Sequence, residues 1–250
     1  MLRTSLLLLC IWAISGSLVF GQDWDREQQD PHATELWSPV PPKVTPGEGT
    51  APPSDAIILF DGTDLKNWTH PNGKAAQWVV EDGAMTVKPR SGGIQTKQEF
   101  RDVQLHIEWR SPIEPDKQGQ GRGNSGVFLM GIYEVQVLES HGSTTYSNGQ
   151  AGSIYKQHVP LVNATRPAGE WQSYDIIFTA PVFGESGRVI HPATMTVFHN
   201  GVLIQNHVSL MGNTPYKGLP TYDNRKATGP ISLQDHSNEV SYRNVWVREL

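Results

Sequence analysis

From Ala56 to Leu250 the chain consists of short apolar or alternating segments that end at Gly, Asn, Asp or Pro. Segments of about four to eight residues bounded by such turn residues are typical of β-strands. No stretch has an apolar stripe with the 3.6-residue period and the caps of a helix. Asp82-Gly83 and Asn200-Gly201 lie between two such segments and predict two-residue hairpin turns. The clearest predicted strands are Ile57–Phe60, Trp78–Val80, Ala84–Val87, Val103–Trp109, Val127–Met130, Tyr133–Leu138, Tyr174–Phe178, Thr194–His199, Ile231–Gln234 and Val245–Val247.

The number of these segments and the lack of helical patterns predict an all-β domain over residues 56–250. Glycine and proline contribute 24 and 18 of the 250 residues, which is a composition rich in turns. A sheet is stable when another layer covers its apolar face, so this many strands need two packed layers. We therefore expect a β-sandwich or jelly roll of two antiparallel sheets.

The first 21 residues have the features of a secretory signal peptide. Arg3 supplies a positive start, and an apolar run over residues 6–20 precedes a cleavage site before Gln22. The run is about 15 residues, shorter than the roughly 20 that span a bilayer, although an uncleaved anchor is the alternative. Cys10 is the single cysteine and lies inside this segment, so the mature chain should contain no disulfide. Export without disulfides indicates a bacterial periplasm or exterior, with no membrane span after cleavage.

Residues 22–55 have the composition of an acidic, proline-rich linker. Seven of the 18 prolines lie between Pro31 and Pro53, and the segment holds seven acidic residues but two basic ones. Such a segment is a semi-rigid, solvated spacer. The whole chain has a formal charge of −5, and the linker alone contributes −5, from seven acidic and two basic residues. The domain at 56–250 is therefore close to neutral. A chain without a basic surface is not expected to bind nucleic acid.

In three predicted strands the alternation places polar side chains on the face that points away from the core. These outward side chains are His106, Glu108 and Arg110 in the first strand, Glu134 and Gln136 in the second, and Ser232, Gln234 and His236 in the third. If the three strands are neighbours, the side chains form one concave polar platform.

Residues 58–68 read ILFDGTDLKNW, which is similar to the opening LFdG-x-dL-x-x-W of the 3-keto-disaccharide hydrolase family. Further blocks resemble that family in the same order over residues 56–250. They are Trp78–Gly83, Glu108–Arg110, Asn124–Phe128, Tyr133–Glu139, Ala151–Tyr155, Gly169–Trp171, Leu233–His236 and Tyr242–Asn244. The resemblance implies a concanavalin-like or laminarinase-like jelly roll and activity on glycosides oxidised to the ketone at C3. It also implies export by bacteria that degrade carbohydrates.

The sequence departs from the family pattern at three positions. Glu139 stands where an Asp is usual, Gln172 replaces an Asn, and Ser237 replaces a Gly. The carboxylate of Glu139 extends one carbon further than that of an Asp, which changes its reach into the site.

The chemistry of a 3-keto sugar suggests roles for the outward side chains. The ketone acidifies the C2–H, so a base can remove that proton and the C1 substituent can leave by β-elimination before water adds back. His236 suits proton transfer because an imidazole ordinarily titrates near neutral pH. Glu134, if desolvated, serves as the base or acid partner, and Arg110 holds the developing oxyanion. Glu139 completes the predicted catalytic set.

The predicted substrate-binding residues carry amides, a further carboxylate and aromatic rings. They are Gln136, Gln234, Asn124, Glu108, Tyr155 and Trp171. A divalent metal acting as a Lewis acid is a further possibility, with His236, Glu134 and Glu139 as ligands. No cofactor is indicated with certainty. The structural alternative is that Glu108 and Arg110 only pair on a wet sheet face and that Trp171 plugs the end of the sandwich.

Two other functions suit the same predicted fold. A laminarinase-type glycoside hydrolase uses a Glu-x-Asp-x-x-Glu strand, and Glu134 and Glu139 have this spacing with Gln136 between them. Residues five apart on a regular strand point to opposite faces, so this reading needs a bulge after Gln136. The other alternative is a sugar-binding module without catalysis.

Overall fold

The computed structural model describes residues 31, 32 and 34–250 of the chain. The compact unit runs from Val44 to Leu250. Residues 31, 32 and 34–43, the described part of the unit before it, contain no helix or strand. The predicted signal peptide lies outside the described residues, as do residues 22–30 of the linker. No helix in the described part of the chain is long and apolar enough to cross a membrane.

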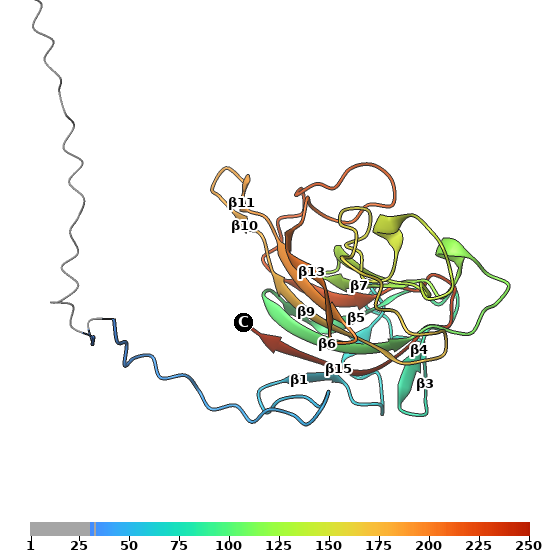
Figure 1. Ribbon diagram of the computed structural model, residues 1–250, viewed down its shortest axis with the longest axis horizontal. Helices are drawn as coiled ribbons and strands as arrows, with labels where there is room; N and C mark the ends of the chain where they lie inside the picture. The colour runs from blue at the N-terminus through green and yellow to red at the C-terminus, as the bar shows by residue number, and fades with distance from the viewer. Residues whose placement is uncertain (1–30, 33) are drawn as a thin grey trace, which may run out of the picture. The chain divides into compact units, whose positions relative to one another are not determined.

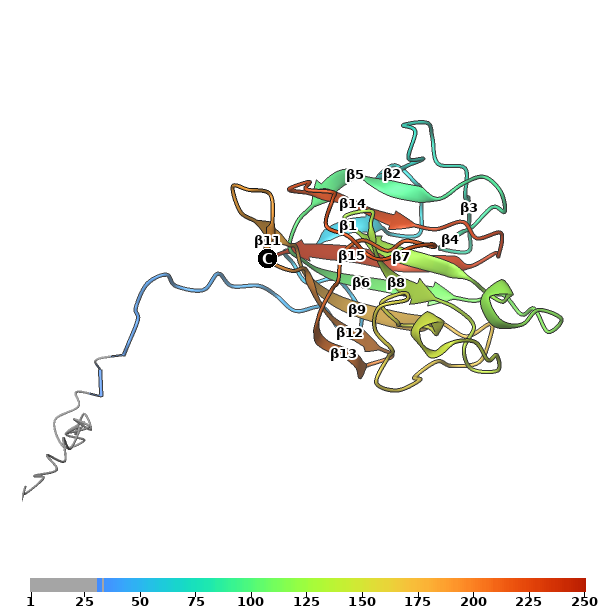
Figure 2. The ribbon, with the colours of Figure 1, turned by 90° about the horizontal axis from the view of Figure 1, so that it is seen from above.

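The predicted all-β jelly-roll fold of two antiparallel sheets is confirmed. The compact unit packs a large sheet against a small one, and Figures 1 and 2 show the two as separate layers. The large sheet has the order β13 (Val202–Ser209), β12 (Thr194–His199), β9 (Gln172–Thr179), β6 (Val103–Arg110), β15 (Ser241–Glu249), β4 (Ala84–Thr86) and β3 (Val79–Glu81), with β1 (Ile57–Phe60) also paired to β15. The small sheet has the order β2 (Trp68–Thr69), β5 (Ile94–Phe100), β14 (Gly229–Leu233), β7 (Ser125–Leu129) and β8 (Tyr133–Val137). A separate two-stranded ribbon joins β10 (Val182–Phe183) and β11 (Val189–His191).

The core lies between the two sheets. Tyr133 of β8 packs against Phe178 of β9 with ring centroids 5.5 Å apart and the ring planes tilted by 37°. Two buried tyrosines of the large sheet also bond to the small one: Tyr174 Oη donates to Gln136 O at 2.8 Å, and Tyr242 Oη donates to Ser125 Oγ at 2.7 Å. These bonds satisfy the polar ends of the rings inside an apolar layer, which fixes the spacing of the sheets.

Both predicted hairpins are present. Asp82-Gly83 joins β3 to β4, and Asn200-Gly201 joins β12 to β13. All four residues have positive φ between 51° and 78°, as a type I′ turn requires. Strand β5 was not among the predicted strands because its central residues, Lys97 to Glu99, are exposed and polar.

The last residues of the predicted linker belong to the compact unit, which begins at Val44. The backbone oxygen of Thr50 accepts hydrogen bonds from Trp246 Nε1 at 3.1 Å and from Asn244 Nδ2 at 2.9 Å. Arg248 Nη2 lies 2.6 Å from Asp55 Oδ2. The segment from Val44 to Asp55 therefore packs on the outer face of the large sheet.

Candidate functional site

The three polar strands divide between the two sheets. Strand β6 lies in the large sheet, whereas β8 and β14 lie in the small sheet with β7 between them. The predicted alternation of faces is confirmed, because Leu105, Ile107 and Trp109 of β6 belong to the hydrophobic core. His106 and Glu108 are buried too, but they contact Trp246 and Arg243 on the other face. The outward residues of β6 consequently lie on the opposite side of the sandwich from those of β8 and β14. The condition for one shared platform, that the three strands are neighbours, therefore does not hold for β6.

A pocket of about 480 Å³ lies on the outward face of the small sheet, and we call it the β8 pocket. Strands β7, β8 and the end of β14 form its floor, and loops from the rest of the domain form its walls. It is lined by Gln120, Asn124, Phe128, Glu134, Gln136, Tyr146, Tyr155, Lys156, Thr214, Tyr216, Gln234 and His236. Six of the predicted site residues, Asn124, Glu134, Gln136, Tyr155, Gln234 and His236, thus meet in one place.

Glu134 is the buried carboxyl of this pocket, with 4% of its surface exposed. Desolvation by burial raises the pKa of Glu134 from 4.5 to about 8. In the described part of the chain no cationic side chain forms an ion pair with it. The group is therefore mostly protonated at neutral pH and can donate a proton to a bound ligand.

Gly126 of β7 makes room for that carboxyl. Gly126 faces Gln136 across the β7–β8 pair, and a Cβ there would lie 2.5 Å from Glu134 Oε1 and 2.8 Å from Phe128 Cε2. Any larger residue would displace the carboxyl, which gives this glycine a role beyond shaping the strand.

Amide side chains lie beside Glu134. In the amide orientation that pairs both of its polar atoms, Gln136 Nε2 donates to Glu134 Oε1 at 3.1 Å and to Ser125 O at 3.0 Å, and its Oε1 faces the Gln120 side chain at 3.0 Å. Asn124 Nδ2 donates to Gln120 O at 2.7 Å. These three side chains hold one another in place and present donors and acceptors suited to sugar hydroxyls.

A pair of tyrosines closes another wall of the β8 pocket. The hydroxyls of Tyr146 and Tyr155 are 2.6 Å apart. Burial and the bond to Tyr146 raise the pKa of Tyr155 above its ordinary value, so the hydroxyl stays protonated. Lys156 Nζ lies 5.4 Å from the ring centroid of Tyr155 and 4.6 Å from that of Tyr216. Lys156 also has a φ of +60°, a conformation that non-glycine residues seldom adopt.

His236 reaches the pocket from the turn that follows β14. Its neighbour Asp235 fixes this turn, because the carboxylate accepts from Ser237 N at 2.8 Å and from Gly92 N at 2.9 Å. Gln234 N donates to Gly126 O at 3.1 Å, which ties the strand end to β7. The side chain of His236 is exposed and lines the β8 pocket.

Glu139 lies outside the β8 pocket. Its Oε2 is 3.0 Å from Arg122 Nε, and its Oε1 accepts from the backbone nitrogens of His141 at 3.0 Å and Gly142 at 2.9 Å. The β7–β8 register is regular from Tyr133 to Val137, and Glu139 follows the end of this pairing. In this structure Glu139 thus holds the loop at residues 139–142 and does not line the β8 pocket with Glu134.

The three metal ligands considered from the sequence do not all come together, because Glu134 and His236 line the β8 pocket and Glu139 does not. Glu139 is engaged with Arg122, and no three His, Cys, Asp or Glu side chains cluster anywhere in residues 31, 32 and 34–250. The side chains of the β8 pocket supply amides and hydroxyls rather than a set of anionic ligands.

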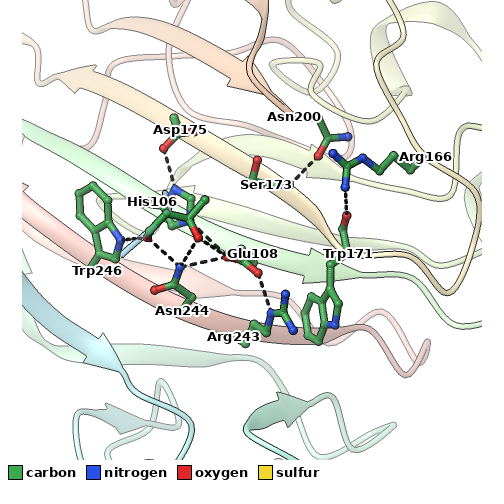
Figure 3. Close-up of polar contacts among 11 residues, drawn as sticks. His106, Glu108, Arg166, Trp171, Ser173, Asp175, Asn200, Arg243, Asn244 and Trp246 are labelled. Atoms are coloured by element: carbon green, nitrogen blue, oxygen red, sulfur yellow. Dashed lines mark hydrogen bonds and ion pairs between the residues drawn. The ribbon is translucent and has the colours of Figure 1, made fainter. Parts of the chain in front are cut away.

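Glu108 belongs to a second polar group, the outer polar cluster, on the outer face of the large sheet (Figure 3). The cluster consists of His106, Glu108, Asp175, Arg243, Asn244 and Thr50. Glu108 accepts from Arg243 Nε at 2.6 Å, Asn244 Nδ2 at 3.0 Å and Thr50 Oγ1 at 3.0 Å. Although burial opposes ionisation, His106 and these donors hold the pKa of Glu108 well below its usual range.

His106 is the centre of that cluster. Its Nδ1 lies 2.6 Å from Asp175 Oδ1, and its ring stacks on Trp246 with centroids 5.2 Å apart. Burial lowers the pKa of His106, but Asp175 and Glu108 more than compensate and raise it from 6.5 to about 9. The cluster anchors the segment around Thr50 through hydrogen bonds among its own members. His106 Nε2 is buried without a hydrogen bond and lies 3.8 Å from Glu108 Oε1.

Arg110 and Trp171 also lie on the outer side of the large sheet. The Trp171 ring has Arg110 Cζ at 4.7 Å and Arg243 Cζ at 4.1 Å from its centroid. Figure 3 shows Trp171 beside Arg243. Neither Arg110 nor Trp171 lines the β8 pocket. The expectation that Arg110 serves the same site as Glu134 and His236 is wrong, because the two sheets separate them.

Several lining residues were absent from the sequence prediction. They are Gln120, Phe128, Tyr146, Lys156, Thr214 and Tyr216. All except Phe128 lie outside the strands, where no alternation assigns a side chain to a face. Phe128 was assignable, since it alternates with Val127 and Leu129 of the core.

Comparison with known proteins identifies relatives of the whole domain. Residues 55–248 match the family described as 3-keto-alpha-glucoside-1,2-lyase-like domain. A 3-keto-disaccharide hydrolase from Bacteroides thetaiotaomicron is 24% identical over an alignment of 241 residues, and the match covers 78% of this chain and 78% of that protein.

Two crystal structures from Parabacteroides distasonis, both provisionally named as glycosyl hydrolases, are also similar. The first is 50% identical with a TM-score of 0.84 and covers 88% of this chain and 97% of its own. The second is 21% identical with a TM-score of 0.57, covers 78% of this chain and 94% of its own, and shares the fold.

Proposed function

The chain belongs to the 3-keto-alpha-glucoside-1,2-lyase-like domain family, and we propose that it cleaves glycosides that carry a ketone at C3 of the sugar. The observation that carries this proposal is the β8 pocket itself. It places a buried, protonated carboxyl and a histidine among amide side chains, and no cation among the described residues forms an ion pair with that carboxyl. That combination suits transfer of one proton to a neutral sugar and removal of another from it.

In the proposed reaction a base removes the proton from C2, and the C2–H electron pair forms the enolate of the C3 ketone. The enolate then expels the C1 substituent, whose oxygen takes a proton from an acid, so that a C1–C2 double bond remains. Water adds to C1 and a proton returns to C2, which gives the free 3-keto sugar. The net change is hydrolysis, with no oxidant or reductant consumed.

The pocket offers one residue for each proton. Glu134 supplies the proton to the leaving oxygen because burial keeps it protonated at neutral pH. His236 accepts the C2 proton from its position at the exposed side of the pocket. The amides of Asn124, Gln136 and Gln234 bind the sugar hydroxyls and the developing enolate oxygen.

Turnover in D₂O tests this order of steps. Elimination followed by hydration should place deuterium at C2 of the released 3-keto sugar, as measured by NMR or mass spectrometry after full conversion. A sample without protein corrects for spontaneous exchange next to the ketone. Aglycone release with hydrogen retained at C2 would refute the elimination and favour direct displacement at C1.

We expect His236→Ala to lower kcat for a 3-keto-glucoside by about 10²-fold or more. The side chain is exposed, so the free energy of unfolding should change by less than about 0.5 kcal/mol. Steady-state kinetics and urea denaturation measure the two quantities. His191, exposed on β11, provides the matched control His191→Ala, which should leave both unchanged. A large loss of stability with His236→Ala would instead mark the residue as structural.

We expect Gly126→Ala to lower kcat about tenfold or more, because the new methyl group meets Glu134 Oε1 at 2.5 Å and moves the proton donor. Crowding of this kind typically costs about 1–3 kcal/mol of stability. The control is Gly121→Ala, because a Cβ at Gly121 meets nothing within 4 Å. Equal kinetics for the Gly126 and Gly121 variants would show that the position of the Glu134 carboxyl does not limit turnover.

Other functions remain measurable alternatives. A two-carboxylate hydrolase needs a second acid near Glu134, and the placement of Glu139 against Arg122 speaks against that pair. A sugar-binding module would bind a 3-keto-glucoside without releasing its aglycone. We also propose that the enzyme acts outside the cytoplasm, on the strength of the apolar run after Arg3. The mature protein would then begin at Gln22, which N-terminal sequencing tests.

A further inference from the structure

A second pocket of about 420 Å³ adjoins the β8 pocket, and we call it the Leu219 pocket. It shares two lining residues, Tyr146 and Lys156, with the β8 pocket. Its remaining lining residues are Asn148, Met211, Pro215, Gly218, Leu219 and Pro220. A ligand that extends from the β8 pocket past Tyr146 and Lys156 therefore contacts the more apolar lining of the Leu219 pocket.

The Leu219 pocket offers little to a second sugar. Met211 and Leu219 contribute aliphatic side chains, and Pro215 and Pro220 have no backbone N–H to donate. Lys156 Nζ already donates to Tyr216 O at 2.6 Å. The polar side chains of this lining are Asn148, Tyr146 and Lys156, and the last two are already bonded to Tyr155 and to Tyr216. A sugar here would therefore recover few of the hydrogen bonds that it makes to water. An apolar group would gain by the same burial.

One loop builds a wall of both pockets and is fixed at its base. Asn213 N donates to Thr221 O at 2.9 Å, and Thr221 N donates back to Asn213 Oδ1 at 2.9 Å. Thr214 Oγ1 accepts from Glu134 N at 3.1 Å, which ties the loop to the strand that carries the acid. The loop between Asn213 and Thr221 thus presents its apolar tip at a set distance from Glu134.

The shared residues are also held in place. A Cβ at Gly149 would lie 2.1 Å from Cε2 of Tyr146, so this glycine lets the ring pack directly on the backbone. The Tyr146 hydroxyl bonds to Tyr155, and the side chain is still 42% exposed. Leu219, at 84% exposure, has no apolar cover in the described structure. The pocket is therefore formed in advance and open to a ligand.

We propose that the Leu219 pocket is the leaving-group subsite and that it selects 3-keto-glycosides whose aglycone is alkyl or aromatic rather than a second sugar. This inference rests on the proposed function of the β8 pocket. The sugar ring occupies the β8 pocket with its C1 oxygen toward Tyr146, and the aglycone lies between Tyr146, Met211 and Leu219.

The test compares methyl and butyl 3-keto-glucosides with a 3-keto-disaccharide on the full chain. Methanol and butanol are leaving groups of nearly equal acidity, so their difference reports the burial of the aglycone. Each buried methylene is worth about 0.8 kcal/mol, or roughly fourfold in kcat/KM. We expect the butyl glycoside to exceed both the methyl glycoside and the disaccharide by about tenfold or more.

Leu219→Asp should reduce the butyl-to-methyl ratio at least about threefold, since the new carboxylate makes burial of the alkyl chain unfavourable. The control is Leu161→Asp, because Leu161 is 65% exposed and lies outside both pockets. This variant should keep the butyl-to-methyl ratio of the wild type. Turnover of all three substrates with equal kcat/KM, or with the disaccharide fastest, would overturn the subsite and leave the proposed function standing. No turnover of any 3-keto substrate would overturn both.

Discussion

Replacing Glu134 by glutamine is expected to lower kcat for a 3-keto-glucoside by about 10²- to 10⁴-fold, the usual worth of a general acid. Glutamine keeps the size of the side chain and its contact with Gly126 but has no acidic proton. Steady-state kinetics with a 3-keto-glucoside measure the loss. Unchanged turnover by Glu134→Gln would remove Glu134 from the chemistry.

The stability of the Glu134→Gln variant gives a separate prediction, and its measurement shows whether the variant is still folded. The pKa of Glu134 is about 8 in the folded chain and near 4.5 when the chain unfolds, so the folded state binds the extra proton between these values. The stabilisation that this proton on Glu134 provides is fully present below about pH 4.5 and is lost as the pH rises through 8. Relative to Glu134→Gln, the wild type should lose on the order of 3–5 kcal/mol over this range. Urea denaturation at pH 5 and pH 8 measures the difference, and parallel pH profiles for the two proteins would contradict it.

Replacing Glu139 by alanine is expected to lower the free energy of unfolding by about 3–5 kcal/mol, as removal of one partner of a buried ion pair does. Glu139 is 1% exposed, and its loss leaves Arg122 and two backbone nitrogens, those of His141 and Gly142, without their acceptor. Urea denaturation at neutral pH with an unchanged m-value measures the effect.

The exposed Glu185 supplies the matched control, because Glu185→Ala should change stability by less than about 0.5 kcal/mol. The conservative variant Glu139→Gln separates a structural role from a catalytic one. If Glu139→Gln keeps its stability but loses turnover, the carboxylate takes part in the chemistry and the structural account of this residue is wrong.

The alternation of side chains predicted which residues face the core but not which strands are neighbours. Leu105, Ile107 and Trp109 are buried as the period-two pattern requires. Strand β6 pairs with β9 and β15, partners that are distant in the sequence, and this pairing puts Glu108 and Arg110 on the far side of the sandwich. Register and face follow from local sequence, whereas the choice between two sheets depends on long-range packing.

The residues that loops contribute to the site could not be predicted from the sequence. Tyr146, Lys156, Thr214 and Tyr216 come from segments without periodicity, so nothing in the sequence assigned them to the pocket. Glu134, Gln136 and Gln234 were predictable because each alternates with core residues in or next to a strand of the small sheet. The sequence predicts a role for Glu134 in proton transfer only if its side chain is desolvated, because that burial depends on loops that close over β8.

The most direct test of the proposed function compares a methyl 3-keto-glucoside with the same glucoside that has not been oxidised. The full chain is incubated with each substrate at neutral pH, and released methanol is measured over time beside the Glu134→Gln variant. The ketone makes the C2 proton removable, so we expect wild-type protein to release methanol from the 3-keto-glucoside and not detectably from the unoxidised sugar. Equal release from the two sugars would contradict the proposed chemistry and favour a hydrolase that needs no ketone.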